Sequence, residues 1–382
     1  MKIAVLNKTR GGISGGYRKY LLSVIPRLAR HPDVEGVLCT SPPGLDIHES
    51  LESLPKLHCI DCLPFQVMRH RPEPSLRKAL DDFSPDVVFV PLARYIRYNR
   101  VPTVVMVQNT WPLVSRLHDR HLGQSLVYAA ERFETGVAVQ KADHVIVISG
   151  YAGELIQKKW QVPEEKLSLI YFGVEAHPGG SEKKPLAIPP EWKGRFLFTA
   201  GSIAPFRGLD DILGVFADNA AGDLSTLNLV IAGEARRDME GYRKKLMQYA
   251  ETQGISSRVL WAGRLTSDEM AWCYKNCQSF LMMSRFEACP NIALEAMAHG
   301  CLIISTENPP MPEFFQDNAL YYPAGDTGCL SEVLERALTL DEEERTALAD
   351  KAQLRSMEFS WDVTAEKTVK ILKEAASGRE HK

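Results

Sequence analysis

Short apolar segments alternate with amphipathic helical segments along most of the chain, and this alternation restricts the fold more than any other feature. Each pair predicts a buried strand of a parallel sheet and its crossover helix. Between the first two apolar segments, five side chains recur at helical spacing: Tyr17, Tyr20, Leu21, Val24 and Leu28. Strand, glycine-rich turn, helix and strand open a Rossmann-like sheet. The predicted strands of the first half are residues 2–6, 36–40, 86–90, 103–108 and 144–149.

The alternation stops within residues 176–193, where HPGGSEKKPLAIPPEWK has the composition of a linker. It then restarts, with helices predicted at 238–253 and 267–276. A chain of 382 residues accommodates two α/β domains. We therefore expect an N-terminal domain at 1–175, a linker at 176–193, a C-terminal domain at 194–358 and a terminal helix with a frayed tail at 359–382. The predicted strands of the second half are residues 196–200, 227–232, 259–262, 279–283 and 302–305.

The fold class expected is α/β, with two Rossmann-like domains facing across a cleft. Ligands of parallel sheets bind at the carboxyl ends of the strands, so the turns after strands are where functional residues are expected.

The composition excludes several classes of function. The net charge of −3 gives no support to nucleic-acid binding. No apolar run approaches the roughly 20 residues of a membrane-spanning helix, and the apolar part of MKIAVLNKTRGG is too short for a secretory signal, so we expect a cytoplasmic protein. The eight cysteines are too sparse for a disulfide framework. Cys59 and Cys62 form an isolated C-x-x-C, which is better explained by chance than by a metal, and Cys273 and Cys277 share a helix face, as core residues do.

Residues 284–300, SRFEACPNIALEAMAHG, follow an apolar strand and run into a helix. Pro290 suits the first helical turn and Gly300 suits the position just beyond the helix end. The backbone N–H groups near Asn291 and Ile292, with the positive end of the helix dipole, favour a phosphate or a sugar oxygen. The segment is therefore a candidate anion site.

Two glutamates stand on either side of this candidate anion site. Glu287 precedes it, and Glu295 is the only ionisable residue of NIALEAMA. A carboxylate among apolar neighbours is costly unless it is solvated or hydrogen-bonded, and ribose hydroxyls are suitable donors. The alternatives are a Glu295 that points outward from an amphipathic helix and a Glu287 that is an ordinary loop or N-cap carboxylate.

Glu287 and Glu295 resemble the E-x7-E motif of the family-4 retaining glycosyltransferases, which have the GT-B fold. Further segments occur in the order of that family: MKIAVL, PDVVFV, ADHVIVIS, YFGVE, TAGSIAPFRGLDD, LVIAGE, VLWAGRL, EAMAHG with CLIIST, MPEFFQDNALYY and FSW. The resemblance implies that Glu287 contacts the donor sugar and Glu295 the ribose, and that the last helix packs toward the N-terminal domain. It implies transfer from a nucleotide-diphosphate sugar to a glycan or glycolipid acceptor, in bacterial surface polysaccharide or lipopolysaccharide synthesis.

The segment GSIAPFRG directly after the predicted strand 196–200 offers Arg207 as a cation for the diphosphate. The family usually has an arginine after the first glycine and a lysine before the second; here Ser202 and Arg207 stand at those positions. Either another basic residue compensates or the diphosphate is held with fewer charges, and Ser202 is equally a turn residue. Arg264 and Leu265, after the strand 259–262, are candidates for lining the base.

The glycine loop RGGISGGYRK after the first strand is not a P-loop, because Tyr17 and Arg18 replace the required Lys-Ser/Thr pair. An ATPase is therefore not expected, and the missing G-x-G-x-x-G excludes a dinucleotide-dependent dehydrogenase. By the resemblance, Gly15 and Gly16 approach the diphosphate and the transferred sugar; the alternative is a plain strand-to-helix turn. The candidate donor-binding residues are Gly15, Gly16, Ser202, Arg207, Arg264, Leu265, Glu287, Cys289, Asn291, Ile292 and Glu295, of which Glu287 and Arg207 are also the candidate catalytic residues.

The acceptor side is expected at Gln108 and Asn109, where the family often carries a His-Asp pair. These residues offer no general base. The resemblance implies a front-side reaction in which the leaving phosphate takes the acceptor proton, so that positioning and electrostatics carry the rate. His118 or His121 could act instead, although a histidine on a polar helix is more often solvated.

No Asp-x-Asp occurs, so the metal-bridged diphosphate site of the other major glycosyltransferase fold lacks its ligands; we expect no metal and no cofactor. A basic surface could bring the protein to the inner membrane face or to a lipid-linked acceptor, or it could be merely solvated. The rival functions are a nucleotide-sugar epimerase or phosphorylase on the same fold and a non-catalytic nucleotide-sugar-binding subunit. The basic residues are Arg69, His70, Arg71, Arg94, Arg97, Arg100, Arg116 and Arg120.

Overall fold

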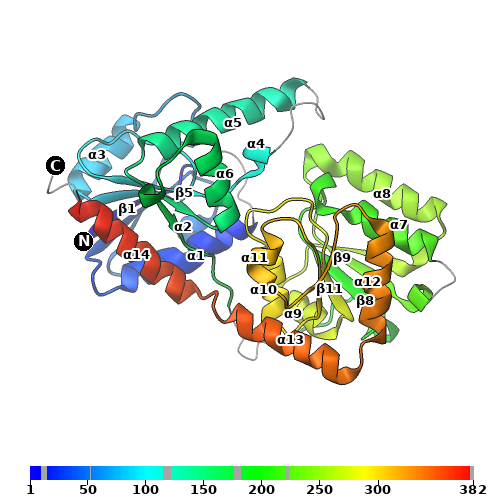
Figure 1. The fold of residues 1–382 in the computed structure, drawn as a ribbon. Helices are drawn as coiled ribbons and strands as arrows, with labels where there is room; N and C mark the ends of the chain where they lie inside the picture. The colour runs from blue at the N-terminus through cyan, green and yellow to red at the C-terminus, as the bar shows by residue number, and fades with distance from the viewer. Residues whose placement is uncertain (10–14, 52, 115–121, 176–181, 220–222, 379–382) are drawn as a thin grey trace. The chain divides into compact units, whose positions relative to one another are not determined.

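The computed structural model describes residues 1–9, 15–51, 53–114, 122–175, 182–219 and 223–378. The chain divides into two compact units, each a parallel sheet with helices packed around it (Figure 1). Unit 1 comprises Met1–Gly173 and Ser360–Lys382, and unit 2 comprises Val174–Phe359. The described part of the predicted linker, residues 182–193, belongs to unit 2, and residues 176–181 lie outside the described residues.

The sheet of unit 1 is parallel throughout, with the strand order β3-β2-β1-β4-β5-β6-β7. The order reverses between β1 and β4, which is the topological switch point of a Rossmann-like sheet. The sequence did not predict β3 or β7, because these edge strands are partly exposed and lack a continuous apolar run. The strands are β1 (Lys2–Leu6), β2 (Gly36–Ser41), β3 (Leu57–Asp61), β4 (Val87–Val90), β5 (Thr103–Val107), β6 (His144–Val147) and β7 (Leu167–Leu169).

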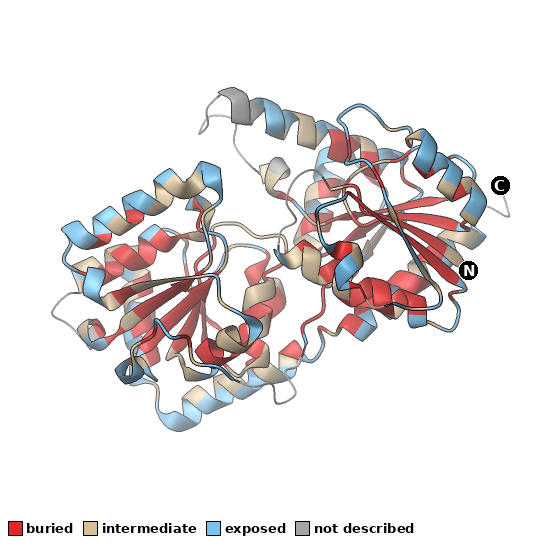
Figure 2. Cartoon of the chain, turned by 180° about the vertical axis from the view of Figure 1, so that it is seen from behind, coloured by how far each residue is buried: buried red, intermediate tan, exposed pale blue. Residues whose placement is uncertain are grey.

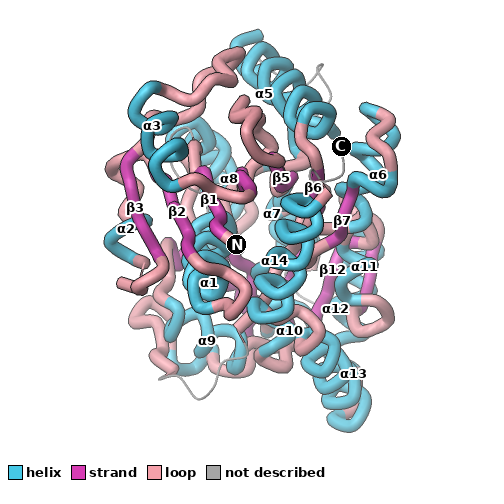
Figure 3. Tube along the Cα trace, turned by 90° about the vertical axis from the view of Figure 1, so that its left-hand side faces the viewer, coloured by secondary structure: helices cyan, strands magenta, loops and turns pink. Residues whose placement is uncertain are grey.

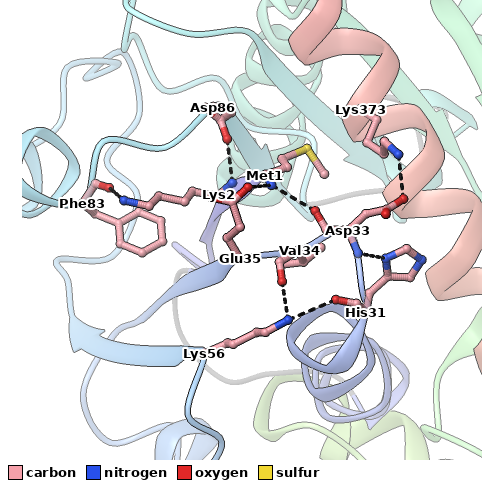
Figure 4. Close-up of polar contacts among 10 residues, drawn as sticks. All are labelled: Met1, Lys2, His31, Asp33, Val34, Glu35, Lys56, Phe83, Asp86 and Lys373. Carbon is pink, nitrogen blue, oxygen red and sulfur yellow. Dashed lines mark hydrogen bonds and ion pairs between the residues drawn. The ribbon is translucent and has the colours of Figure 1, made fainter.

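The terminal helix α14 (Trp361–Ser377) belongs to unit 1, where it packs beside α1 (Figure 3). The Trp361 ring meets that of Tyr20 edge-on, with centroids 6.1 Å apart. Lys373 Nζ lies 2.6 Å from Asp33 Oδ2, next to the start of β1 (Figure 4). The helices of unit 1 are α1 (Gly15–Arg30), α2 (Ile47–Ser50), α3 (Pro74–Phe83), α4 (Trp111–Val114), α5 (Leu122–Lys141), α6 (Gly150–Trp160) and α14.

The sheet of unit 2 is also parallel, with the order β10-β9-β8-β11-β12-β13 and a switch point between β8 and β11. The short edge strand β13 was not predicted. The strands are β8 (Phe196–Ala200), β9 (Asn228–Ala232), β10 (Val259–Gly263), β11 (Ser279–Met282), β12 (Ile303–Thr306) and β13 (Leu320–Tyr322). The helices are α7 (Leu209–Asp218), α8 (Glu240–Thr252), α9 (Ser267–Asn276), α10 (Asn291–Ala298), α11 (Met311–Phe315), α12 (Thr327–Thr339) and α13 (Glu342–Ser356).

The central strands of each sheet are buried on both faces (Figure 2). Their near-continuous apolar sequences follow from this, because helices cover both sides of a parallel sheet. In unit 2, the ring of Phe198 on β8 packs edge-on against Tyr274 of α9 and Phe280 of β11, with centroids 5.4 and 5.7 Å away. This aromatic group lies within unit 2 and fixes the position of Tyr274, which contacts the candidate site described next.

Candidate active site

The carboxyl ends of β8 and β11 meet at the switch point of unit 2, where ligands of such sheets bind. The two loops that leave these strands contact each other directly. The backbone N–H of Arg285 donates to the Phe206 carbonyl at 2.8 Å. A small pocket opens here, and its lining includes Gly201, Ser202, Arg207, Leu209, Met283 and Ser284.

Arg207 and Ser284 are polar residues of this lining, and both contact Glu287. Arg207 Nη1 lies 2.5 Å from Glu287 Oε1, and the Ser284 hydroxyl donates to the same oxygen at 3.0 Å. The side chains of Arg207 and Glu287 are only 19% and 12% exposed. Burial raises the pKa of the Glu287 carboxyl above its ordinary value, while the Arg207 charge and the Ser284 hydroxyl oppose this rise. The two predicted catalytic residues are thus brought together as a partly buried ion pair.

Three glycines allow the backbone to pack closely around this ion pair. Gly201 has φ +127°, and a Cβ there would lie 3.1 Å from Arg207 Cζ and 3.3 Å from Ile292 Cδ1. At Gly208, φ is +66° and a Cβ would lie 2.3 Å from the Met283 carbonyl oxygen. At Gly233, φ is +123° and a Cβ would overlap the Gly201 carbonyl at 1.9 Å. Only glycine fits such positions without moving the backbone.

Arg285 ties the two loops together, and sequence reasoning missed it. Its guanidinium donates to both Asp210 carboxylate oxygens at 3.0 and 2.9 Å, to Asp211 Oδ1 at 2.5 Å and to the Pro205 carbonyl at 2.7 Å. Tyr242 adds a hydrogen bond to Asp210 at 3.2 Å. The available signal was the Asp-Asp pair beginning α7 together with an arginine two residues before Glu287. This network positions the loop that carries Arg207.

Helix α10 begins one residue later than the sequence predicted. Pro290 is its N-cap and not a residue of its first turn, while Gly300 stands beyond the end with φ +70°. The N–H of Asn291 donates to the Cys289 carbonyl at 3.0 Å, so it is not one of the free amides expected there. The N–H of Ile292 lies in the first turn, where no acceptor within the helix exists. Cys289 is buried, and its thiol contacts Asn291 Oδ1 at 3.1 Å.

Glu295 does not point freely into solvent. It is partly buried, and the Tyr274 hydroxyl lies 3.3 Å from its Oε2 and 3.2 Å from the carbonyl oxygen of Ile292. Tyr274 is itself held by the aromatic group of Phe198 and Phe280. The carboxylate therefore has a fixed place on α10, on the same helix whose first turn carries Ile292.

The other predicted donor residues of unit 2 lie at the same end of the sheet. Ser202 is exposed directly after β8. Arg264, exposed, and Leu265, partly buried, follow β10. Ser202 lines the pocket, whereas Arg264 and Leu265, which follow an edge strand two positions from β8, are not part of its lining.

The predicted residues of unit 1 have separate local roles. Gly15 and Gly16 are the first residues of α1, and a Cβ on Gly15 would meet no heavy atom within 4 Å among the described residues. Gln108 donates to the Pro91 carbonyl at 2.8 Å, which links the ends of β5 and β4. Asn109 is exposed and accepts from the Trp111 N–H at 3.0 Å, at the start of α4. His118 and His121 lie outside the described residues.

Several of the basic residues of unit 1 are already paired. His70 Nε2 lies 2.9 Å from Glu134 Oε2, and Arg100 Nη1 lies 3.0 Å from Asp81 Oδ1. Arg94 donates to the Ala93 carbonyl. Arg116 and Arg120 lie outside the described residues. Carboxylates therefore lie beside two of these basic residues and offset part of the group's charge.

Within the described ranges, one group of three potential metal ligands is found, Cys39, His48 and Cys59 of unit 1, and it includes none of the predicted site residues. None of the described helices is long and apolar enough to cross a bilayer.

Comparison with known families identifies the class. Residues 14–177 match the family described as Glycosyltransferase Family 4, and residues 182–355 match Glycosyl transferases group 1. The predicted resemblance is thereby confirmed: the chain belongs to the group 1 and family 4 glycosyltransferases, and its two Rossmann-like domains have the GT-B fold.

Individual relatives are distant. The serotype-specific mannosyltransferase WbdA of Escherichia coli is 23% identical over 308 residues, covering 75% of this chain and 36% of WbdA, so the chain spans about a third of its length. The O-antigen chain mannosyltransferase RfbU of Salmonella typhimurium is 22% identical over 331 residues, which are 84% of this chain and 87% of RfbU. Anabaena HepE, solved in complex with UDP and glucose, superposes with a TM-score of 0.75 at 18% identity, covering 98% and 100% of the two chains.

Proposed function

We propose that the chain is a retaining glycosyltransferase that takes a hexose from a nucleotide-diphosphate sugar bound at the ends of β8 and β11. The observation that carries this proposal is the partly buried Arg207–Glu287 pair, which lies at the switch point beside the first turn of α10. The HepE structure holds UDP and glucose on the same fold, which supports a donor of this class.

Arg207 acts on the diphosphate in this proposal. A guanidinium at 2.5 Å from a carboxylate can exchange that partner for a phosphate oxygen without leaving its pocket. The Arg207 Nε is buried and has no hydrogen-bond partner among the described residues, so the guanidinium has an unused donor. As the bond between sugar and diphosphate breaks, Arg207 stabilises the charge that collects on the leaving group.

Glu287 then positions the donor sugar. When the diphosphate takes over Arg207, the carboxylate oxygens become free to accept hydrogen bonds from sugar hydroxyls, which replace the lost ion pair. Ser284 keeps one of these oxygens oriented, because its hydroxyl donates to Glu287 Oε1 at 3.0 Å. In the same proposal Glu295, whose Oε2 the Tyr274 hydroxyl contacts at 3.3 Å, accepts hydrogen bonds from the ribose hydroxyls.

The charge balance requires further cations or backbone donors. The diphosphate of a nucleotide sugar carries two negative charges. Ser202 is neutral and supplies no positive charge to balance them. The Ile292 amide at the positive end of α10 offers a partial charge, roughly half an elementary charge for a whole helix terminus. Arg264, exposed after β10, is proposed as a second cation at this end of the sheet. No metal is required in this scheme.

The acceptor is proposed to be a growing glycan or a lipid-linked sugar of a bacterial surface polysaccharide. This rests on the relatives, since WbdA and RfbU are named as mannosyltransferases of serotype-specific and O-antigen chains. Gln108, Asn109 and His118 remain the proposed acceptor-side residues, with Gly15 and Gly16 proposed to approach the diphosphate. Cytoplasmic location with contact to the inner membrane face is part of the same proposal.

The test is turnover of a panel of UDP-, GDP-, ADP- and CDP-sugars, measured as nucleotide release with and without sugar acceptors. We expect one donor class to be used, and Glu287→Gln to lower the rate about 100-fold, as loss of one transition-state contact does. Glu251→Gln, an exposed glutamate on α8, is the matched control and should leave the rate unchanged.

The product distinguishes the rivals. If NMR shows that the anomeric carbon of the transferred sugar has the same configuration in the product as in the donor, the reaction is retaining. An inverted configuration contradicts this. A donor that is converted to another nucleotide sugar without an acceptor would show an epimerase. Tight donor binding with no turnover under any acceptor condition would show a binding subunit.

A further inference from the structure

Three metal-ligating side chains from separate segments meet in unit 1. β2 and β3 are parallel neighbours, and their register pairs Cys39 with Cys59, so the two thiols project from the same face of the sheet. Helix α2, which follows β2, brings His48 to this face. One ligand atom from each of the three residues lies within 4.8 Å of the other two.

His48 is oriented as a metal-bound histidine is. Its Nε2 is buried and has no hydrogen-bond partner in the described part of the chain, which is costly for a ring nitrogen. Its other nitrogen, Nδ1, lies 3.4 Å from Asp61 Oδ1 at the end of β3. A carboxylate beside Nδ1 fixes the tautomer of the ring and leaves Nε2 with a lone pair for a metal.

We propose that Cys39, Cys59 and His48 bind one Zn²⁺, with Asp61 orienting His48. Two thiolates and one imidazole are ligands that favour zinc, and the two thiolates balance its charge. With Zn–S of about 2.3 Å and Zn–N of about 2.0 Å, tetrahedral ligand atoms stand roughly 3.5–3.8 Å apart. The distances between the three ligand atoms must therefore shorten by about 1 Å when zinc binds. Side-chain rotation allows this because Cys59 is exposed. Water takes the fourth position on the exposed side.

The local structure gives this site a stabilising role. Helix α2 has four residues, too few to be stable alone. It is held by Arg18, which donates to the Leu45 and Asp46 carbonyls at 2.8 and 3.2 Å and to the Ser50 hydroxyl at 2.7 Å. A zinc ion would add a second link that joins α2 to β2 and β3.

Cys62 is not part of the site, although it forms the C-x-x-C with Cys59. Its thiol lies 3.5 Å from the Asn7 carbonyl oxygen, which it can donate to. This buried cysteine is therefore a matched control, because it removes a thiol from the same segment without touching the proposed ligands.

The experiment uses the full chain, purified without chelators, and measures zinc content and then Zn²⁺ and Co²⁺ binding to the stripped protein. We expect one zinc per chain, a dissociation constant in roughly the nanomolar range, and a thiolate-to-cobalt absorption band with a tetrahedral visible spectrum. Cys59→Ser and His48→Gln should weaken zinc binding at least 100-fold, and Asp61→Asn about 10- to 100-fold. Cys62→Ser should bind as the unmodified chain does.

The proposal is overturned if the unmodified chain binds zinc no tighter than roughly 10 µM, or if Cys62→Ser weakens binding as much as Cys59→Ser. A Cys39–Cys59 disulfide in freshly purified protein, seen as the loss of two hydrogens by mass spectrometry, also overturns it. Circular dichroism of each stripped variant identifies any that fail to fold. If a variant does not fold, the test is the cobalt spectrum of the unmodified chain. A spectrum without a thiolate-to-cobalt band contradicts the proposed site.

Discussion

Replacing Arg207 by methionine should destabilise the protein in a way that depends on pH. The substitution keeps much of the apolar volume but removes the cation that lies 2.5 Å from Glu287 Oε1. Glu287, whose side chain is 12% exposed in the unmodified chain, then keeps the Ser284 hydroxyl as its one side-chain donor among the described residues. Breaking a fully buried pair by removing one partner costs about 3–5 kcal/mol. Because both side chains here retain some contact with water, we expect about 2 kcal/mol, or a melting-temperature decrease of about 4–8 °C for a domain of this size.

The sign of the pH dependence follows from Glu287. Burial raises the pKa of this carboxyl, so the folded state disfavours the ionised form, and stability falls as pH rises through the raised pKa. Arg207 opposes that rise, and its removal moves the pKa further up. The loss of stability in Arg207→Met should therefore be larger at about pH 8 than at about pH 4.5, because more of the carboxyl is protonated at the lower pH and then needs no cation.

The assay is thermal unfolding of Arg207→Met, Glu287→Gln and the double variant at both pH values, each compared with the unmodified chain at the same pH. The double variant should regain most of the stability lost in Arg207→Met, since no unpaired charge remains. Lys244→Met, on the exposed side of α8, controls for loss of a positive charge. An equal loss at both pH values, with no recovery in the double variant, would refute the reasoning.

Three further outcomes are expected. Gly201→Ala should weaken donor binding at least 10-fold, measured by calorimetry, because the new Cβ would lie 3.1 Å from Arg207 Cζ at a φ of +127°; unchanged binding would show that the close approach is unimportant. Arg285→Met should lower turnover while Arg243→Met, on α8, does not, because Arg285 holds Asp210, Asp211 and the loop that carries Arg207. Trp361→Ala should lower the free energy of unfolding by about 3–5 kcal/mol in chemical denaturation, as loss of a buried aromatic residue does. The reason is that the Trp361 ring packs on Tyr20 and Phe172 within unit 1. A decrease below about 1 kcal/mol would show that α14 packs only loosely there.

The buried central strands could be predicted from sequence because both of their faces are covered, which requires a continuous apolar run. Of the four edge strands, only β10 was predicted: β3 carries exposed residues such as His58 and Cys59, and β7 has three residues, so neither shows that pattern. The same reason explains β13. An apolar run can be recognised only when it is long enough, and the buried residues Leu320 and Tyr322 of β13 stand in a strand of three residues.

The site was predicted as far as single residues and motifs allow. The E-x7-E spacing and GSIAPFRG located Glu287 and Arg207, and the structure brings these two together. What sequence could not supply were contacts between distant segments, such as Arg285 with Asp210 or Tyr274 with Glu295, because no spacing along the chain encodes them. Cys59 illustrates the same limit, since its neighbour in space is Cys39 on β2 and not the Cys62 that shares its C-x-x-C.

The most direct measurement is the affinity of the full chain for nucleotide sugars, with Arg207→Met and Glu295→Gln compared in parallel by calorimetry. We predict that one class of nucleotide-diphosphate sugar binds, that Arg207→Met weakens both the nucleoside diphosphate and the intact donor at least 10-fold, and that Glu295→Gln does the same. If no nucleotide sugar binds, or if both variants bind as tightly as the unmodified chain, the ends of β8 and β11 are not the donor site.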